Sequence, residues 1–232
     1  MDYTVNLKKI LSEKQFACLQ SISDSVRTVM SPELFNHSIG TLNYCCQMAD
    51  RFLLNAAGRC FEDCAIDSGR NRHEKTIPEL CFNLAASAIL HDYGKIFGIE
   101  ELRAIAVKEK LRISDFELNC GPILHSFMAP FLLKRDFQIK DSDVLNSVRI
   151  HTTGSVKMSI TDKILYISDK IEETRDYEGL EKLRYLSLGD INLCLLEVYK
   201  SNIIYVIKGN NVLHPDTAKI WNYIHGGLKN AI

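Results

Sequence analysis

Residues 79–92 read ELCFNLAASAILHD, an apolar run that ends on a histidine and an aspartate. Pro78 precedes the run, at a position that proline favours where helices begin. Leu84, Ala88 and His91 recur at helical spacing, so His91 continues the stripe that faces the core. Asp92 follows about 100° further round the helix axis, so the two polar groups can face one point. The stretch predicts a buried helix with polar functional groups at its C-terminal end.

The same helical spacing extends through nearly the whole chain and predicts a single all-α domain. The expected helices span residues 7–30, 32–57, 78–91, 99–110, 122 to beyond 132, 141–151, 159–174, 190–208 and 215–229. Residues 1–30 are expected to form an N-terminal helical extension and 31–229 the main domain, with a long polar loop at 58–76. Residues 203–207 have strand composition but no partner strand, so we interpret them as buried helix.

Composition limits both the architecture and the partners. A chain of 232 residues, 46% of them hydrophobic, can bury about 70% of its unfolded surface in one core. Lys and Arg number 28 and Asp and Glu 29, so the net charge of −1 gives no support for nucleic-acid or membrane binding. Neither a signal peptide nor an apolar run long enough to span a membrane is recognisable, which predicts a cytoplasmic protein.

The eight cysteines are expected to be reduced thiols in that compartment. Most of them lie in apolar surroundings, where cysteine behaves as a small hydrophobic residue. Cys60, Cys64 and His73 offer an alternative, a zinc site. The second cysteine pair that such a site usually has is missing, so we do not favour it.

Three more histidines and one aspartate lie on inward or borderline helix faces: His37, His125, His151 and Asp169. A single histidine on an apolar face is more often a hydrogen-bonded core residue than a ligand. Asp169 taken alone also fits a solvated acidic edge. Together with His91 and Asp92, however, they make four histidines and two aspartates on five helices, which favours a shared site. Imidazole and carboxylate donors without sulfur suit a hydrolytic iron, manganese or zinc centre.

Lys95 lies one turn beyond the histidine–aspartate pair, four residues after His91 and three after Asp92. A cation on the same side as a metal site is what a phosphate group requires. The sequence therefore points to phosphate chemistry at this centre.

The order His37, His91-Asp92, Asp169 resembles the pattern of HD-domain metal-dependent phosphohydrolases. The wider match is similar to the YqeK-like subgroup, the bacterial symmetrical diadenosine tetraphosphate hydrolases. The stretches that carry it are residues 85–96, 123–133, 148–180 and 214–224. The HD pattern is short and shared by many activities, whereas the block from His151 to Arg175 is more specific.

The resemblance implies an all-helical HD fold that binds iron, as one or two ions, or manganese or another divalent transition metal. It implies cleavage of diadenosine tetraphosphate into two ADP, and it leaves a homodimer open. The implied metal ligands are His37, His91, Asp92 and Asp169, with His125 and His151 as ligands of a second metal or as phosphate contacts. The implied nucleotide contacts are Lys95, Thr152, Thr153, Gly154 and Arg175, and Asp92 and Lys95 are the implied catalytic residues.

Where this sequence differs from the pattern of the subgroup, the differences bear on which nucleotide is cleaved more than on the type of reaction. Leu34 stands where the subgroup usually has an arginine, and Ser126-Phe127-Met128 replaces expected small residues. Two alternatives therefore stay open: an HD hydrolase of nucleoside mono-, di- or cyclic phosphates, and a weakly active nucleotide sensor. The intact ligand set and Lys95 argue against the sensor.

Overall fold

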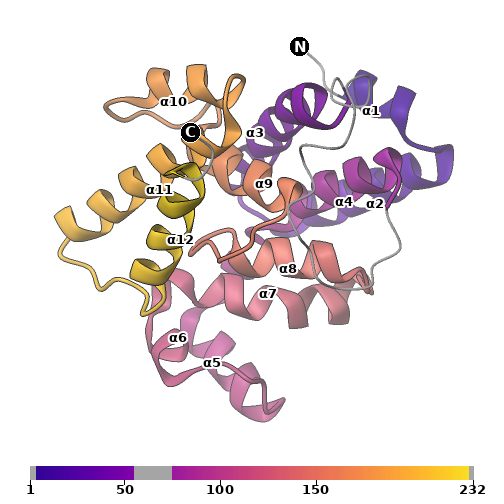
Figure 1. The fold of residues 1–232 in the computed structure, drawn as a ribbon. Helices are drawn as coiled ribbons and strands as arrows, with labels where there is room; N and C mark the ends of the chain where they lie inside the picture. Colours follow the sequence, from indigo (N-terminus) through magenta and orange to yellow (C-terminus); the bar gives the residue numbers. More distant parts are fainter. Residues whose placement is uncertain (1–3, 55–74, 230–232) are drawn as a thin grey trace.

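The computed structural model describes residues 4–54 and 75–229, and every regular element in these ranges is helical (Figure 1). The α-helices are α1 (Thr4–Ile10), α2 (Glu13–Val29), α3 (Pro32–Ala49), α4 (Ile77–Leu90), α5 (Ile99–Lys108), α6 (Asp115–Asn119), α7 (Gly121–Phe137), α8 (Ser142–Ile150), α9 (Ile160–Ile171), α10 (Leu180–Ser187), α11 (Ile191–Lys208) and α12 (Thr217–Lys229). A π-helical turn, Asp50–Leu54, extends α3, and a 3₁₀ turn, Tyr93–Ile96, follows α4.

Helix α4 is the centre of the molecule and packs against α2, α3, α8 and α9. Every residue from Asn83 to Leu90 is buried, as expected for a helix that is apolar on all sides. Helices α7 and α8 pack on each other below it, and α11 and α12 lie side by side at the left of Figure 1. The prediction of an all-α fold built around residues 79–92 is confirmed.

Three predicted helix starts are confirmed by their capping residues. The side chains of Ser31, Asp141 and Ser159 accept hydrogen bonds from backbone N–H groups in the first turns of α3, α8 and α9. Each therefore satisfies a donor that has no partner within its helix. Gly154 adopts φ 71° after α8, the left-handed conformation expected of a glycine that ends a helix.

The predicted first helix, residues 7–30, is wrong in one respect, because it is broken at Ser12 into α1 and α2. Ser12 and Gln15 form a capping box, in which the backbone N–H of Gln15 donates to Ser12 Oγ and that of Ser12 donates to Gln15 Oε1. Apolar spacing continues across the break, so periodicity alone does not reveal it.

Two other predictions need correction. The helix predicted over 159–174 ends at Ile171, because Glu172 takes an extended backbone conformation. Residues 203–207 are helical as predicted but are not buried: Tyr205 is 75% exposed and Ile207 55%. The short elements Tyr93–Ile96, α6 and α10 were not predicted.

Several expectations fall on residues that the structure does not describe. Cys60, Cys64, His73 and most of the predicted 58–76 loop lie outside the described residues. The α3 helix, predicted to reach residue 57, ends at Ala49 and passes into the π-helical turn. Among the helices that are described, none is both long and apolar enough to cross a membrane.

Candidate metal centre

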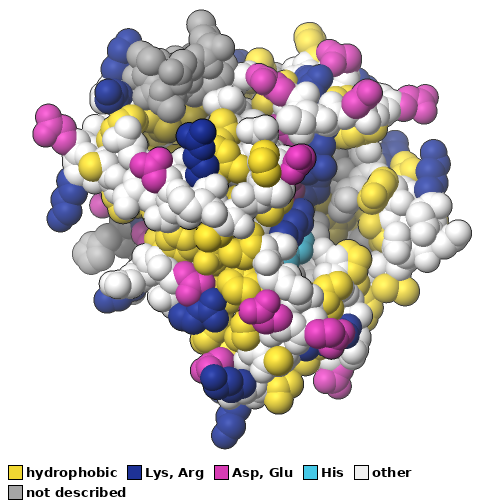
Figure 2. Space-filling view, turned by 180° about the vertical axis from the view of Figure 1, so that it is seen from behind, with side chains coloured by type: hydrophobic (Ala, Val, Ile, Leu, Met, Phe, Trp, Pro, Cys, Tyr) yellow, Lys and Arg dark blue, Asp and Glu magenta, His cyan; other side chains and the backbone are white. Residues whose placement is uncertain are grey.

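Five helices bring the six inward-facing polar residues to one place. The contributions are His37 from α3, His91 and Asp92 from the end of α4, His125 from α7, His151 from the end of α8 and Asp169 from α9. All are buried except His37, whose side chain is 12% exposed. Figure 2 shows histidine in a recess of the rear face, with Lys and Arg side chains beside it.

One group of donor atoms surrounds Oδ2 of Asp92. This oxygen lies 3.4 Å from His91 Nε2 and 3.6 Å from His37 Nε2. Asp169 Oδ1 approaches the same two nitrogens, at 2.9 Å from His37 and 3.6 Å from His91. The four residues predicted as metal ligands therefore have their donor atoms together.

A second group surrounds the other oxygen, Oδ1, of the same carboxylate. It lies 3.3 Å from His125 Nε2 and 3.4 Å from His151 Nε2, and those two nitrogens are 3.3 Å apart. No described residue makes a hydrogen bond of good geometry to Asp92 Oδ1. Asp92 thus offers one oxygen to each pair of histidines.

The outer nitrogens of three imidazoles are held by acceptors. His91 Nδ1 donates to Ala88 O at 2.8 Å, and His151 Nδ1 donates to Val148 O at 2.7 Å. His37 Nδ1 lies 3.0 Å from the Glu172 carboxylate. Each Nδ1 therefore carries the proton in the neutral ring, and the lone pair of Nε2 points to the centre.

The two carboxylates keep their charge although they are buried. Burial raises the pKa of Asp92, but His91, His125 and His151 outweigh it and hold this pKa well below the usual range. Burial acts on Asp169 in the same way, and Lys170 and His37 hold its pKa well below the usual range. Two buried negative charges demand positive charge nearby.

The pKa of His91 is shifted in the opposite direction from those of His125 and His151. Burial lowers the pKa of His91, but Asp92 and Asp169 outweigh it and raise this pKa to about 10. Burial lowers the pKa of His151 to about 4, and it also lowers the pKa of His125. His125 and His151 are therefore neutral near pH 7, which is the state that binds a metal.

The arrangement fits a divalent transition metal. The opposed lone pairs of His37 and His91, whose Nε2 atoms are 3.2 Å apart, repel unless a proton or a metal ion lies between them. Three groups of three residues could each hold a metal ion, because the donor atoms within a group all lie within 4.8 Å of one another. The groups are His37–His91–Asp92, His91–His151–Asp169 and Asp92–His125–His151. Nitrogen and carboxylate donors without sulfur suit iron, manganese or zinc.

Three cationic side chains surround the centre. Lys95 Nζ lies 2.7 Å from Asp92 Oδ2, and Arg175 Nη2 donates to Asp169 Oδ1 at 2.9 Å. Lys170 pairs with the other oxygen of Asp169 and donates to the backbone oxygen of His151 at 3.2 Å. The side chains of Lys95 and Arg175 are 43% and 38% exposed, so both can contact a ligand in solution.

The residues after His151 divide between two environments. Thr152 Oγ1 lies 3.0 Å from His151 Nε2 and 3.4 Å from His125 Nε2, beside the second group of donors. Gly154 is buried, and its N–H donates to Ile150 O at 2.8 Å. The end of α8 already uses this N–H, and Gly154 as a nucleotide contact stays a prediction.

Glu172 is a further residue of the site that the sequence analysis did not predict. Its side chain is fully buried, and besides His37 it accepts from the backbone N–H of Thr174 at 2.7 Å. Arg175 Nε also lies 3.5 Å from its Oε1. Gly40 makes room for this carboxylate, since a Cβ there would lie 2.4 Å from Glu172 Oε2. A glycine inside a helix, one turn after His37, was the available signal.

Comparison with known proteins agrees with this geometry. The HD domain family matches residues 34–174. The chain is 26% identical to the symmetrical bis(5'-nucleosyl)-tetraphosphatase of Bacillus subtilis over 202 residues, 87% of this chain and 95% of the relative. It is 33% identical to the protein of the same name from Halalkalibacterium halodurans over 138 residues, 60% of this chain and 73% of the relative.

A solved structure is similar over nearly the whole chain. It is a Clostridium acetobutylicum protein described as a predicted HD superfamily hydrolase involved in NAD metabolism. The TM-score is 0.72 and the identity 26%, covering 89% of this chain and 96% of that one. The two proteins therefore share their overall fold.

Proposed function

The chain belongs to the HD domain family, and on that basis we propose that it is a metal-dependent hydrolase that cleaves diadenosine tetraphosphate into two ADP. The observation that carries the proposal is the placement of Asp92, whose two oxygens each face a separate pair of histidines. Relatives named symmetrical bis(5'-nucleosyl)-tetraphosphatase support the substrate.

The residues present fit a metal centre of one or two ions. His37, His91, Asp92 and Asp169 would hold the first ion, and His125 and His151 would hold a second together with Oδ1 of Asp92. Iron is the metal we propose, and manganese suits the same donors. A bound ion of this kind neutralises phosphate charge and lowers the pKa of its water towards 7.

The cations of the chain position the substrate. Lys95 and Arg175 lie at the exposed edge of the centre, where they can contact phosphoryl oxygens. Arg175 also donates to Asp169 through two nitrogens, which fixes the plane of its guanidinium group. Leu34, at the position where the subgroup usually has an arginine, packs against the hydrophobic core and contributes no charge.

The proposed reaction is symmetrical. The oxygen of water joins one of the two central phosphorus atoms, and that atom's bond to the oxygen bridging the two breaks. The bridging oxygen leaves with the other half, so each product is ADP. Lys95 and Arg175 would stabilise the negative charge that develops on the phosphoryl oxygens during this step.

The test is product chromatography with purified protein, iron or manganese, and a nucleotide panel. ADP as the sole nucleotide product from diadenosine tetraphosphate is expected, with little turnover of nucleoside mono-, di- or cyclic phosphates. Equal amounts of ATP and AMP would overturn the symmetrical assignment. Asp169→Asn, which weakens the proposed ligand set, is expected to lose this activity. Asp162→Asn is the control, because Asp162 lies on the same helix and forms the capping box with Ser159 at its start.

A further inference from the structure

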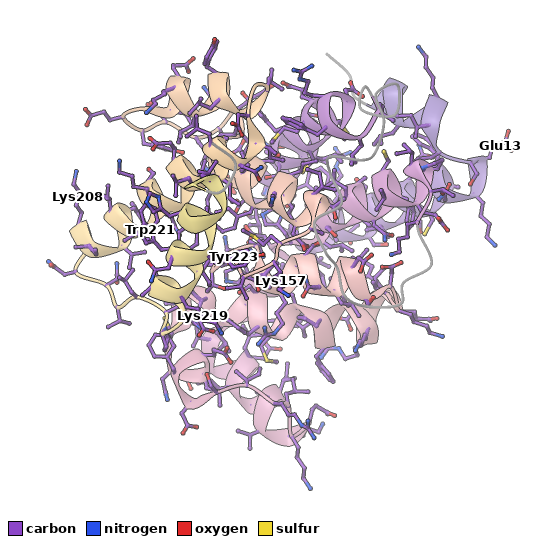
Figure 3. The ribbon with its side chains drawn as sticks, viewed as in Figure 1. Glu13, Lys157, Lys208, Lys219, Trp221 and Tyr223 are labelled. Atoms are coloured by element: carbon purple, nitrogen blue, oxygen red, sulfur yellow. The ribbon has the colours of Figure 1, made fainter. Side chains whose placement is uncertain are left out.

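Apart from the metal centre, a polar cavity lies next to the turn that follows α8. Its volume is about 120 Å³, and its walls come from α6, α7, the end of α8, the residues after His151, and the start of α12 with the residues just before it. Figure 3 places Lys219, one of the lining residues, on the early part of α12. The 214–224 stretch, which the family resemblance singled out, has no part in the metal centre but provides a wall of this cavity.

Flat groups line one side of the cavity. The rings of Phe127 and His214 stack with 5.8 Å between centroids and 13° between planes. Phe116 meets the edge of His214 at 5.6 Å, and the guanidinium of Arg149 lies 4.6 Å from the centre of the Phe127 ring. Such a layered surface suits stacking by another planar group.

Polar atoms in the same wall are incompletely paired. His214 Nδ1 accepts from the backbone N–H of Asp216 at 3.2 Å, so its Nε2 carries a proton. That Nε2 lies 3.7 Å from Glu117 Oε1, and Arg149 Nη2 lies 3.6 Å from the same oxygen. Both separations exceed a direct hydrogen bond, which leaves two donors and a carboxylate oxygen available to a ligand.

Charge and size narrow the chemical class of that ligand. Arg149 and Lys219 balance Glu117 and Asp216, so the cavity suits a neutral group rather than a polyphosphate. An engineered cavity of about 150 Å³ in another protein binds benzene, so 120 Å³ is near the size of one flat ring system. A nitrogen heterocycle with donors and acceptors on its edge meets these requirements.

The cavity is adjacent to the metal centre along the chain. Thr152 contacts His125 and His151, and the next residue, Thr153, already lines the cavity. Building on the proposed function, we propose that this cavity binds one base of the dinucleotide, while the cations around Asp92 and Asp169 bind its phosphates.

Two variants test the assignment. His214→Ala removes the stacking surface and the Nε2 donor, and Ser155→Trp fills the cavity. Each is expected to raise the KM for diadenosine tetraphosphate and the dissociation constant of adenosine about tenfold, the loss expected for one stacked base. Inhibition by inorganic tripolyphosphate, which has no base, is expected to stay unchanged. His225→Ala is the control, because that ring stacks on Trp221 elsewhere on α12.

The outcomes separate the two proposals. Unchanged adenosine binding in both variants, or tripolyphosphate inhibition that weakens in parallel, would overturn the base-binding cavity. If wild-type protein binds adenosine through His214 but does not cleave diadenosine tetraphosphate, the cavity stands and the proposed substrate fails. Melting curves of each variant with its metal content show whether the fold is retained.

Discussion

Asp92 joins the two halves of the centre through a single carboxylate. Its side chain is nearly inaccessible, and its two oxygens face different histidine pairs. Lys95 is the cation nearest to it that reaches solvent. Its neighbours are proposed to have different roles, the histidines as metal ligands and Lys95 as a contact of the substrate.

Lys95→Ala is expected to lower turnover about a hundredfold, because it removes a cation from the developing phosphoryl charge. Metal content should stay unchanged, since an ammonium group cannot ligate a metal. Elemental analysis beside steady-state kinetics measures both. Lys108→Ala, at the exposed end of α5, is the control. Loss of metal in Lys95→Ala would contradict the prediction and show that the lysine maintains the structure of the metal centre.

Glu172→Ala is expected to weaken metal binding about 10- to 100-fold, because His37 loses the acceptor that orients its ring. Glu172→Gln retains an oxygen acceptor and should lose less. Equilibrium dialysis against a graded metal series measures the affinities. Glu173→Ala, an exposed neighbour, is the matched control, and equal losses in Glu172→Ala and the control would contradict the role.

At the scale of elements, helix ends carry the chemistry. His91 ends α4 and His151 ends α8, and each donates its Nδ1 proton to the last turn of its own helix. The turn after α4 lies so close to α7 that a Cβ on Gly94 would come within 2.6 Å of the backbone oxygen of His125. Glycine is therefore required where the two elements meet.

Gly94→Ala is expected to destabilise the protein by about 1–3 kcal/mol, because backbone atoms must move to admit the methyl group. The shift should also separate Asp92 from His125 and lower metal content. Thermal unfolding and elemental analysis measure the two effects. Gly226→Ala, which meets open space inside α12, should leave metal content unchanged and stabilise slightly.

The start of α8 gives a pH prediction. Burial raises the pKa of Asp141, but hydrogen bonds from Lys75 and the backbone of Asp143 outweigh it and lower this pKa. The stabilisation is therefore present above the unfolded pKa of about 3.9 and is lost as pH falls through the folded value.

Asp141→Asn keeps the helix cap and removes the charge, so it isolates the ion pair. The variant should be less stable than wild type by about 0.5–1 kcal/mol near neutral pH, and the difference should shrink as pH falls below the unfolded pKa of about 3.9. Chemical unfolding at several pH values measures it. A gap that does not depend on pH would contradict the ion-pair explanation.

At the scale of the whole molecule, the centre ties together helices far apart in the sequence. Donors come from α3, α4, α7, α8 and α9, and α4 packs against α3, α8 and α9. A ligand that binds only this folded arrangement stabilises all of it. Metal removal should therefore act on global stability as well as on activity.

Metal loading at about 100 times the dissociation constant is expected to add about 2.7 kcal/mol, which corresponds to about 5–10 °C in Tm. Chelation should reverse the gain. His125→Ala combined with His151→Ala should reduce the metal count from two to one per chain. If wild type and the double variant both hold one ion, and only substrate affinity falls, the two histidines are phosphate contacts.

Much of the architecture could be predicted because local physics determines it. Apolar spacing gave the main helices, and Ser31, Asp141 and Ser159 gave their starts, since a cap satisfies donors within its own helix. The break at Ser12 was not predicted, because the apolar spacing continues across it and only the capping box signals it. The exposure of Tyr205 and Ile207 was mispredicted because composition does not say which neighbours cover a helix.

Helical periodicity alone predicts the all-α fold and the inward placement of His37, His91, Asp92, His125, His151 and Asp169, because it assigns each residue to one face of its helix. The grouping of the donors around the two oxygens of Asp92 depends instead on how the helices pack. Helix packing also brings the Glu172 carboxylate to Nδ1 of His37, in space that is open because Gly40 has no side chain. These contacts join residues as far apart in the sequence as His37 and Glu172, 135 positions, and helix packing, not local spacing, sets their distances.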